Sequence, residues 1–109
     1  MDARLPAHLE IAGLRRAAEA AGGFATVLRK GERVGGTVLV VLCENGGNQR
    51  VFERMPRLDG GRQWQLAMAQ DADEKEEFSD YLTRRAARDP DLWIVELDIA
   101  DGERLIALL

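Results

Sequence analysis

The sequence predicts an α+β fold, a mainly antiparallel five-stranded sheet with two helices in the order αββββαβ. Two segments carry apolar residues at helical spacing, and five short runs are rich in residues that favour strands. Glycine- or asparagine-containing turns separate the first four runs, so we expect a four-strand meander followed by a C-terminal strand. A chain of 109 residues has the length of one domain, residues 1–109.

The first helix is predicted over residues 6–21. Pro6 suits the first helical turn, and the pair Gly22-Gly23 is a natural stop. The residues that recur at helical spacing are Leu9, Ile11, Leu14, Ala18 and Ala21.

The four runs of the meander cover residues 24–30, 36–44, 49–55 and 62–68, with turns at 30–33, 45–48 and 59–61. Pro56 removes a backbone donor and marks a sheet edge or a bend. The second run is apolar on both faces, which is typical of a central strand covered on both sides. Either the two helices cover one face each, or both cover one face and a second subunit covers the other.

The second helix is predicted over residues 73–88, ahead of Pro90. A fifth strand follows over residues 92–99, with one apolar face formed by Trp93, Val95, Leu97 and Ile99. The sequence closes with an apolar segment over residues 105–109.

Composition excludes several classes of protein. Fifteen basic and nineteen acidic residues give a net charge of −4, which argues against a sequence-independent nucleic-acid binder. The single cysteine, Cys43, excludes an internal disulfide and thiolate-rich metal centres. Residues 1–6 lack the apolar core of a signal peptide, and the longest apolar run, 38–43, is too short to cross a bilayer. We therefore expect a soluble cytoplasmic protein, with no cofactor and no membrane contact.

Two polar groups are candidate sites. Glu96, Asp98 and Asp101 could bind Mg²⁺ or Ca²⁺ through carboxylate oxygens, or they could form a solvated strand face and a turn. Arg84, Arg85 and Arg88, joined by Arg50, Arg54 and Arg57 and by Trp64 or Tyr81, could hold single-stranded RNA. The alternative for the first three arginines is compensation of the helix dipole.

Two further features involve apolar residues or cysteine. The terminal residues Leu105, Ile106, Leu108 and Leu109 could complete the core, or they could dock a partner or a second copy of the chain. Nucleophilic catalysis would require a pairing of Cys43 with the only histidine, His8, whereas a cysteine at the end of an apolar strand behaves as a small hydrophobe.

Three stretches, 4–16, 22–32 and 88–98, resemble a family of short alphaproteobacterial proteins known as domain of unknown function 1491. The resemblance spans nearly the whole chain and implies a stand-alone domain in a bacterial cytoplasm. It brings no activity, cofactor or catalytic residue. We therefore expect a non-enzymatic protein-interaction module, homo-oligomeric and in the simplest case a homodimer. The alternatives are an RNA-contacting protein or, third, a carboxylate metal site.

Overall fold

The computed structural model describes residues 5–71 and 73–109 and shows an α+β fold. Its elements are α1 (Ala7–Ala20), β1 (Phe24–Arg29), β2 (Val38–Glu44), β3 (Gly47–Pro56), β4 (Arg62–Ala69), α2 (Lys75–Arg88), β5 (Trp93–Asp98) and α3 (Gly102–Ala107). The two predicted helices and five predicted strands are confirmed, with small differences at their ends. The third helix, α3, was not predicted. The first four residues, which carry part of the signal-peptide argument, lie outside the described residues.

The strand order corrects the predicted meander. The sheet runs β1-β5-β2-β3-β4, so β5 lies between β1 and β2. β5 pairs antiparallel with β1 and parallel with β2, which makes the sheet mixed. Only β2, β3 and β4 form the predicted antiparallel meander.

The composition of β2 and β5 explains why they take the centre of the sheet. Six of the seven residues of β2 are buried, and four of the six in β5. Strands that are apolar on both faces lose the most if they lie at an edge. β1 alternates, β4 has no buried residue, and both tolerate a solvated face. The two buried strands therefore pair with each other.

Residues 30–37 connect β1 to β2 without forming a hairpin, because they pass over the start of β5. The Trp93 indole Nε1 donates to the Glu32 carbonyl at 2.7 Å, and the Trp93 amide donates to the Thr37 carbonyl at 2.8 Å. A Cβ on Gly31 or Gly36 would overlap the Asp91 carbonyl oxygen. Gly31 and Gly36 thus permit a close backbone approach, and the turn lies at residues 33–35 and not at the predicted 30–33.

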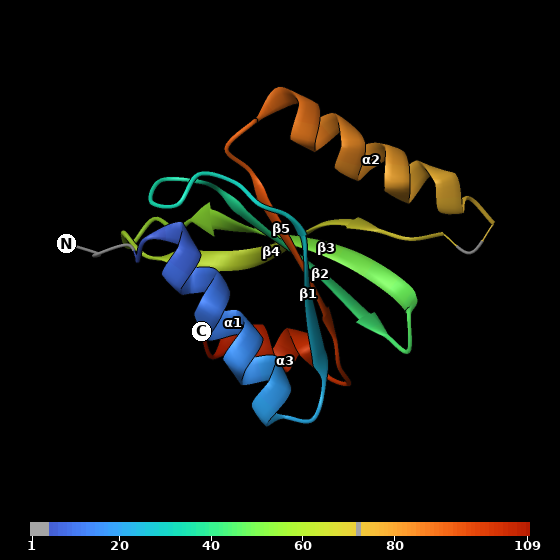
Figure 1. Cartoon of the computed structure of the whole chain (residues 1–109), viewed down its shortest axis with the longest axis horizontal. Helices are drawn as coiled ribbons and strands as arrows, with labels where there is room; N and C mark the ends of the chain where they lie inside the picture. The colour runs from blue at the N-terminus through green and yellow to red at the C-terminus, as the bar shows by residue number, and fades with distance from the viewer. Residues whose placement is uncertain (1–4, 72) are drawn as a thin grey trace.

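The helices divide between the two faces of the sheet, which settles the question that the sequence left open. α1 and α3 lie on one face and α2 on the other (Figure 1). The larger core cluster joins α1 and α3 to Val38, Val40 and Leu42 of β2, and the smaller one joins Phe78 of α2 to Leu39 and Val41. α3 approaches closely because Gly102 packs against Leu42, where a Cβ would lie 2.8 Å from Leu42 Cδ2.

Candidate functional site

The arginines of α2 do not act as one group. Arg84 and Arg88 are exposed, whereas Arg85 is engaged within the protein. Arg85 forms an ion pair with Glu53 of β3 at 3.1 Å and a hydrogen bond to the Tyr81 hydroxyl at 2.8 Å. Arg84 and Arg88 therefore remain the accessible part of the predicted RNA contact.

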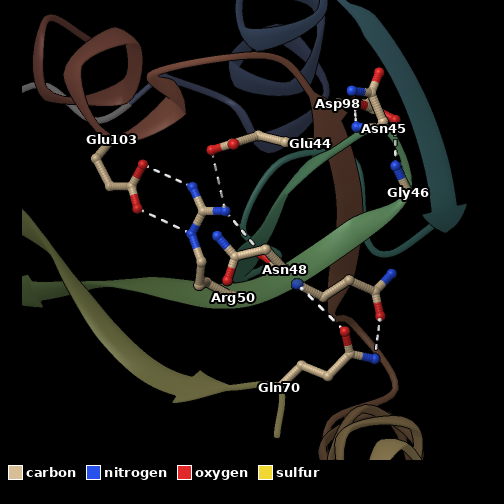
Figure 2. Close-up of polar contacts among 9 residues, drawn as sticks. Glu44, Asn45, Gly46, Asn48, Arg50, Gln70, Asp98 and Glu103 are labelled. Carbon is tan, nitrogen blue, oxygen red and sulfur yellow. Dashed lines mark hydrogen bonds and ion pairs between the residues drawn. The ribbon is translucent and has the colours of Figure 1, made fainter. Parts of the chain in front are cut away.

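The predicted addition of strand arginines to this helix is wrong in its geometry, because Arg50 and Arg54 face α1 and α3 on the opposite side of the sheet. Both guanidinium groups are engaged there. Arg50 is buried and donates two hydrogen bonds to the Glu103 carboxylate, at 2.7 and 2.9 Å (Figure 2). Arg54 pairs with Glu10 at 3.1 Å and lies 4.6 Å from the Trp64 ring centre. Trp64 is thus placed with Arg54 and not with α2.

The structure gives the predicted metal ligands other partners. Both carboxylate oxygens of Asp98 accept backbone hydrogen bonds, from Asn45 at 2.8 Å and Gly46 at 3.0 Å (Figure 2). This fixes the β2–β3 turn, in which both residues have positive φ, as the predicted hairpin signal required. Glu96 accepts from Gln49 at 3.4 Å. Among residues 5–71 and 73–109, no group of three His, Cys, Asp or Glu is arranged to hold a metal ion, and Asp101 is not brought to the other two.

Cys43 and His8 lie at opposite ends of β2. His8 Nδ1 is 2.9 Å from the carbonyl oxygen of Arg33, in the segment that leads into the strand, and Cys43 lies near the other end of the strand. Burial, with the nearby negative charges of Glu96 and Asp98, raises the pKa of the Cys43 thiol to about 11. The thiol therefore stays protonated at neutral pH, which is unfavourable for a nucleophile.

The apolar terminus is divided between core and surface. Ile106 is 1% exposed and belongs to the larger core cluster, against which Leu105 also packs. Leu108 and Leu109 are exposed. Contact of Leu108 and Leu109 with a partner stays a prediction. Ile106 is buried in the protein's own core and is not available to a partner.

An open strand edge with exposed apolar residues occurs at β1. β1 ends the sheet, and its only pairing in the described sheet is with β5. Ala25 and Val27 point to the larger core, so Phe24, Thr26 and Leu28 point to the face of α2. Phe24 is 75% exposed and Leu28 48% exposed, which shows that α2 does not cover this strand.

A groove of about 640 Å³ separates β1 from α2, and we call it the β1–α2 groove. It is lined by Leu28, Arg29, Leu82, Thr83, Ala86, Ala87 and Ile94. A bulge in β1 lies between Val27 and Arg29, so two consecutive side chains, Leu28 and Arg29, reach the groove. Small side chains on α2 leave the groove open.

Arg29 is the charged group of this groove. Its guanidinium donates one hydrogen bond, to the Pro90 carbonyl at 3.3 Å, while its buried Nε has no hydrogen-bond partner within the described chain. No acidic side chain of the described residues forms an ion pair with it. The β1–α2 groove therefore combines an open backbone edge, apolar walls and a cation that lacks a counterion there.

The fold matches solved structures over almost its whole length. A crystal structure of a DUF1491 family protein from Caulobacter crescentus CB15 has 36% sequence identity and a TM-score of 0.79, with 94% of each chain covered. An NMR structure of a family protein from the same organism has 35% identity and a TM-score of 0.77, covering 95% of this chain and 94% of that one. A solution structure from A. tumefaciens has 28% identity, a TM-score of 0.78 and coverage of 94% and 92%.

The family model described as protein of unknown function (DUF1491) matches residues 5–107. The chain belongs to the DUF1491 family. This confirms the resemblance found in the sequence. Comparison with curated proteins finds no match.

Membership in the DUF1491 family establishes the fold but assigns no function, and nothing in these comparisons indicates an enzyme. In this DUF1491 protein, no helix among the described residues is long and apolar enough to span a bilayer. Sequence reasoning missed the β1–α2 groove. The alternation in residues 24–30 was visible, but only the strand order shows that these residues form an open edge.

Proposed function

We propose that this DUF1491 protein is a non-enzymatic interaction module that binds an extended, acidic segment of a partner protein in the β1–α2 groove. The single observation that carries the proposal is Arg29, a half-buried cation without an ion-pair partner in the described chain, in a groove beside an open strand edge. The proposal retains the interaction-module hypothesis drawn from the sequence and gives it a location.

The open edge of β1 supplies the main-chain part of recognition. An edge strand presents unpaired amide and carbonyl groups, and an extended peptide can pair with them as an added strand. Alternate side chains of that strand would lie on the α2 side, against Leu28 and Ile94, with Leu82 as the facing wall. Apolar side chains of the bound peptide at those positions would increase its affinity, because they are removed from water on binding.

The charge of the groove favours an acidic segment. Arg29 has donors to spare, and a carboxylate can accept two parallel hydrogen bonds from one guanidinium. The exposed Arg84 and Arg88 lie on the same helix but do not line the groove, so Arg29 is the cation that an acidic segment would meet there. A carboxylate next to Arg29 would remove the cost of a half-buried, unpaired cation.

The test is a titration with two synthetic octapeptides, one alternating valine with glutamate and one alternating valine with lysine. Backbone amide NMR signals of β1 report binding, because an added strand changes their hydrogen bonds. The glutamate peptide should shift the amide signals of Phe24–Arg29 saturably. The lysine peptide should bind at least about tenfold more weakly, because its positive charges repel Arg29.

Two substitutions localise the effect. Arg29→Gln keeps the size of the side chain and removes its charge, so binding of the glutamate peptide should fall about tenfold. Leu28→Ser reduces the apolar wall and should weaken both peptides. The matched control is Arg16→Gln, an exposed arginine on α1, on the opposite face of the sheet, which should leave binding unchanged. Equal affinity of the wild type and Arg29→Gln for the glutamate peptide would overturn the proposal.

The same protein and its variants also test two alternatives to an acidic segment. Self-association, as the sequence predicted, would give a dimer in light scattering that Leu28→Ser dissociates, and the groove would then belong to a second copy. RNA binding would give saturable shifts with a uridine oligonucleotide that Arg84→Gln and Arg88→Gln together abolish. Such a dimer would reject the acidic segment as the occupant, and so would RNA binding together with no response to the glutamate peptide.

A further inference from the structure

A second hollow lies on the opposite face of the sheet, between the β3–β4 hairpin and α3. Its volume is about 310 Å³, the size of a small-molecule site. We call it the Trp64 hollow. Phe52 and Trp64 line it from the sheet, and Ile106 and Ala107 line it from α3. It shares no residue with the β1–α2 groove.

The indole ring at the base of this hollow is held in place before any ligand arrives. Arg54 pairs with Trp64 across β3 and β4, and its guanidinium lies 4.6 Å from the ring centre. Glu10 fixes that guanidinium from α1 at 3.1 Å, and the Leu109 carbonyl accepts from it at 3.1 Å. A ring fixed in this way loses little freedom when a flat ligand stacks against it.

The same indole carries a polar atom whose hydrogen-bonding capacity is unused. Trp64 Nε1 is buried and has no hydrogen-bond partner within the part of the chain that the structure describes. Buried indole N–H groups normally donate to an acceptor. By contrast, Trp93 Nε1 donates to Glu32 at 2.7 Å. The nitrogen is shielded from solvent, so an oxygen acceptor bound in the Trp64 hollow reaches it only when the side chains that cover it move aside.

Cationic groups line the same hollow, beside Glu103, whose carboxylate is held by Arg50. Arg62 lies on the Trp64 side of β4, two residues away, and also lines an adjoining hollow of about 200 Å³ that contains Glu10. Arg57 forms an ion pair with Asp59 at 3.0 Å, but both side chains are at least half exposed. An exposed pair of this kind is weak and can exchange for a better anion.

We propose that the Trp64 hollow binds a small organic anion with a flat apolar body and one acidic head, an aryl phosphate or an aromatic carboxylate. The head takes hydrogen bonds from Arg62 and Arg57, and one of its oxygens accepts from Trp64 Nε1. The flat body contacts Phe52 and the Trp64 ring. This site is independent of the proposed peptide groove.

The indole region of the ¹H–¹⁵N NMR spectrum tests the proposal, because the protein has two tryptophans and one serves as an internal control. Phenyl phosphate and benzoate are titrated separately and identify the preferred head group. At least one of them should shift the Trp64 signal saturably in the low millimolar range and leave the Trp93 signal in place. Inorganic phosphate has only the acidic head and benzyl alcohol only the flat body, so each should bind at least about tenfold more weakly.

Substitutions separate this site from general attraction to arginine. Arg62→Gln should weaken binding of the preferred anion about tenfold, and Arg57→Gln, at an exposed side chain that does not support the fold, should weaken it severalfold. Arg16→Gln on α1 should change nothing. The proposal is overturned if neither anion shifts the Trp64 signal, if inorganic phosphate binds as well as phenyl phosphate, or if both variants bind like the wild type. The glutamate octapeptide should not move this signal, so the two proposals can fail separately.

Discussion

α1 and α2 are helices of equal length, 14 residues each, on opposite faces of one sheet, yet they are held very differently. α1 buries five residues, among them Ile11 and Leu14. α2 buries only Phe78, with Tyr81 and Leu82 partly buried beside it. α1 therefore forms the fold together with α3, whereas α2 is attached along a narrow line and leaves a groove. A face that is incompletely covered is where a small fold of this kind can bind something else.

The two helices should differ most clearly when one leucine on each is shortened to alanine. Leu14→Ala should lower the free energy of unfolding by about 2–5 kcal/mol, because its side chain is fully buried. Leu82→Ala should cost less than about 1.5 kcal/mol, because that side chain is partly solvated. Urea unfolding measures both variants. Equal losses would show that α2 is as firmly packed as α1.

A difference in local opening should follow from the difference in burial. Backbone amides of α2 should exchange with solvent about thirtyfold faster than those of α1, since local unfolding of a weakly packed helix exposes little apolar surface. Native-state hydrogen exchange followed by NMR gives both sets of rates in one sample. Equal protection of the two helices would show that α2 is packed as firmly as α1.

A smaller effect concerns the ion pair that ties β3 to α3. The hydrogen bonds from Arg50 lower the pKa of Glu103 below its ordinary value of 4.5. The folded state therefore gains stability from the ionised Glu103 at neutral pH, and this gain is lost as the pH falls through the lowered pKa. Glu103→Gln should cost about 1–2 kcal/mol at neutral pH, a range that already allows for solvent screening at the half-exposed Glu103.

The free energy of unfolding lost in Glu103→Gln should depend on pH. The stability difference between wild type and variant should shrink as the pH falls through the lowered pKa of Glu103, and it should vanish once Glu103 is protonated in both the folded and the unfolded state. Urea unfolding at several pH values measures it. Glu53→Gln, at the ion pair between β3 and α2, is the matched control on the other face and should cost less than Glu103→Gln, because Arg85 is more exposed than Arg50. A larger loss for Glu53→Gln would show that α2 depends on polar contacts.

Local patterns were enough to predict the elements but not their neighbours. The apolar spacing in residues 6–21 and the Asn45-Gly46 turn predicted α1 and the β2–β3 hairpin, since both depend on residues close in sequence. The turn predicted at 30–33 lies at 33–35 instead, because Gly31 serves a close approach to Asp91, some sixty residues away in the chain. The short helix α3 was missed because the final residues were interpreted by their apolar character alone.

The candidate sites show the same limit. The sequence singled out Arg84, Arg85 and Arg88 because they are clustered, although Arg85 is engaged by Glu53 and Tyr81. It passed over Arg29 and Arg62, which have no motif around them. What distinguishes Arg29 is burial without an acidic partner in the described chain, and such a property exists only once distant segments have packed together.

Sequence patterns were enough to predict the α+β class, the identity and approximate extent of seven elements, and the central position of the second strand. These follow from periodicity and turn chemistry, which act over a few residues. The insertion of β5 between β1 and β2 became visible only in the folded chain, and this strand order leaves β1 as an edge and places α2 beside it. Strand order is set by the burial of whole faces across the sheet, a nonlocal free energy that no short stretch of the chain encodes.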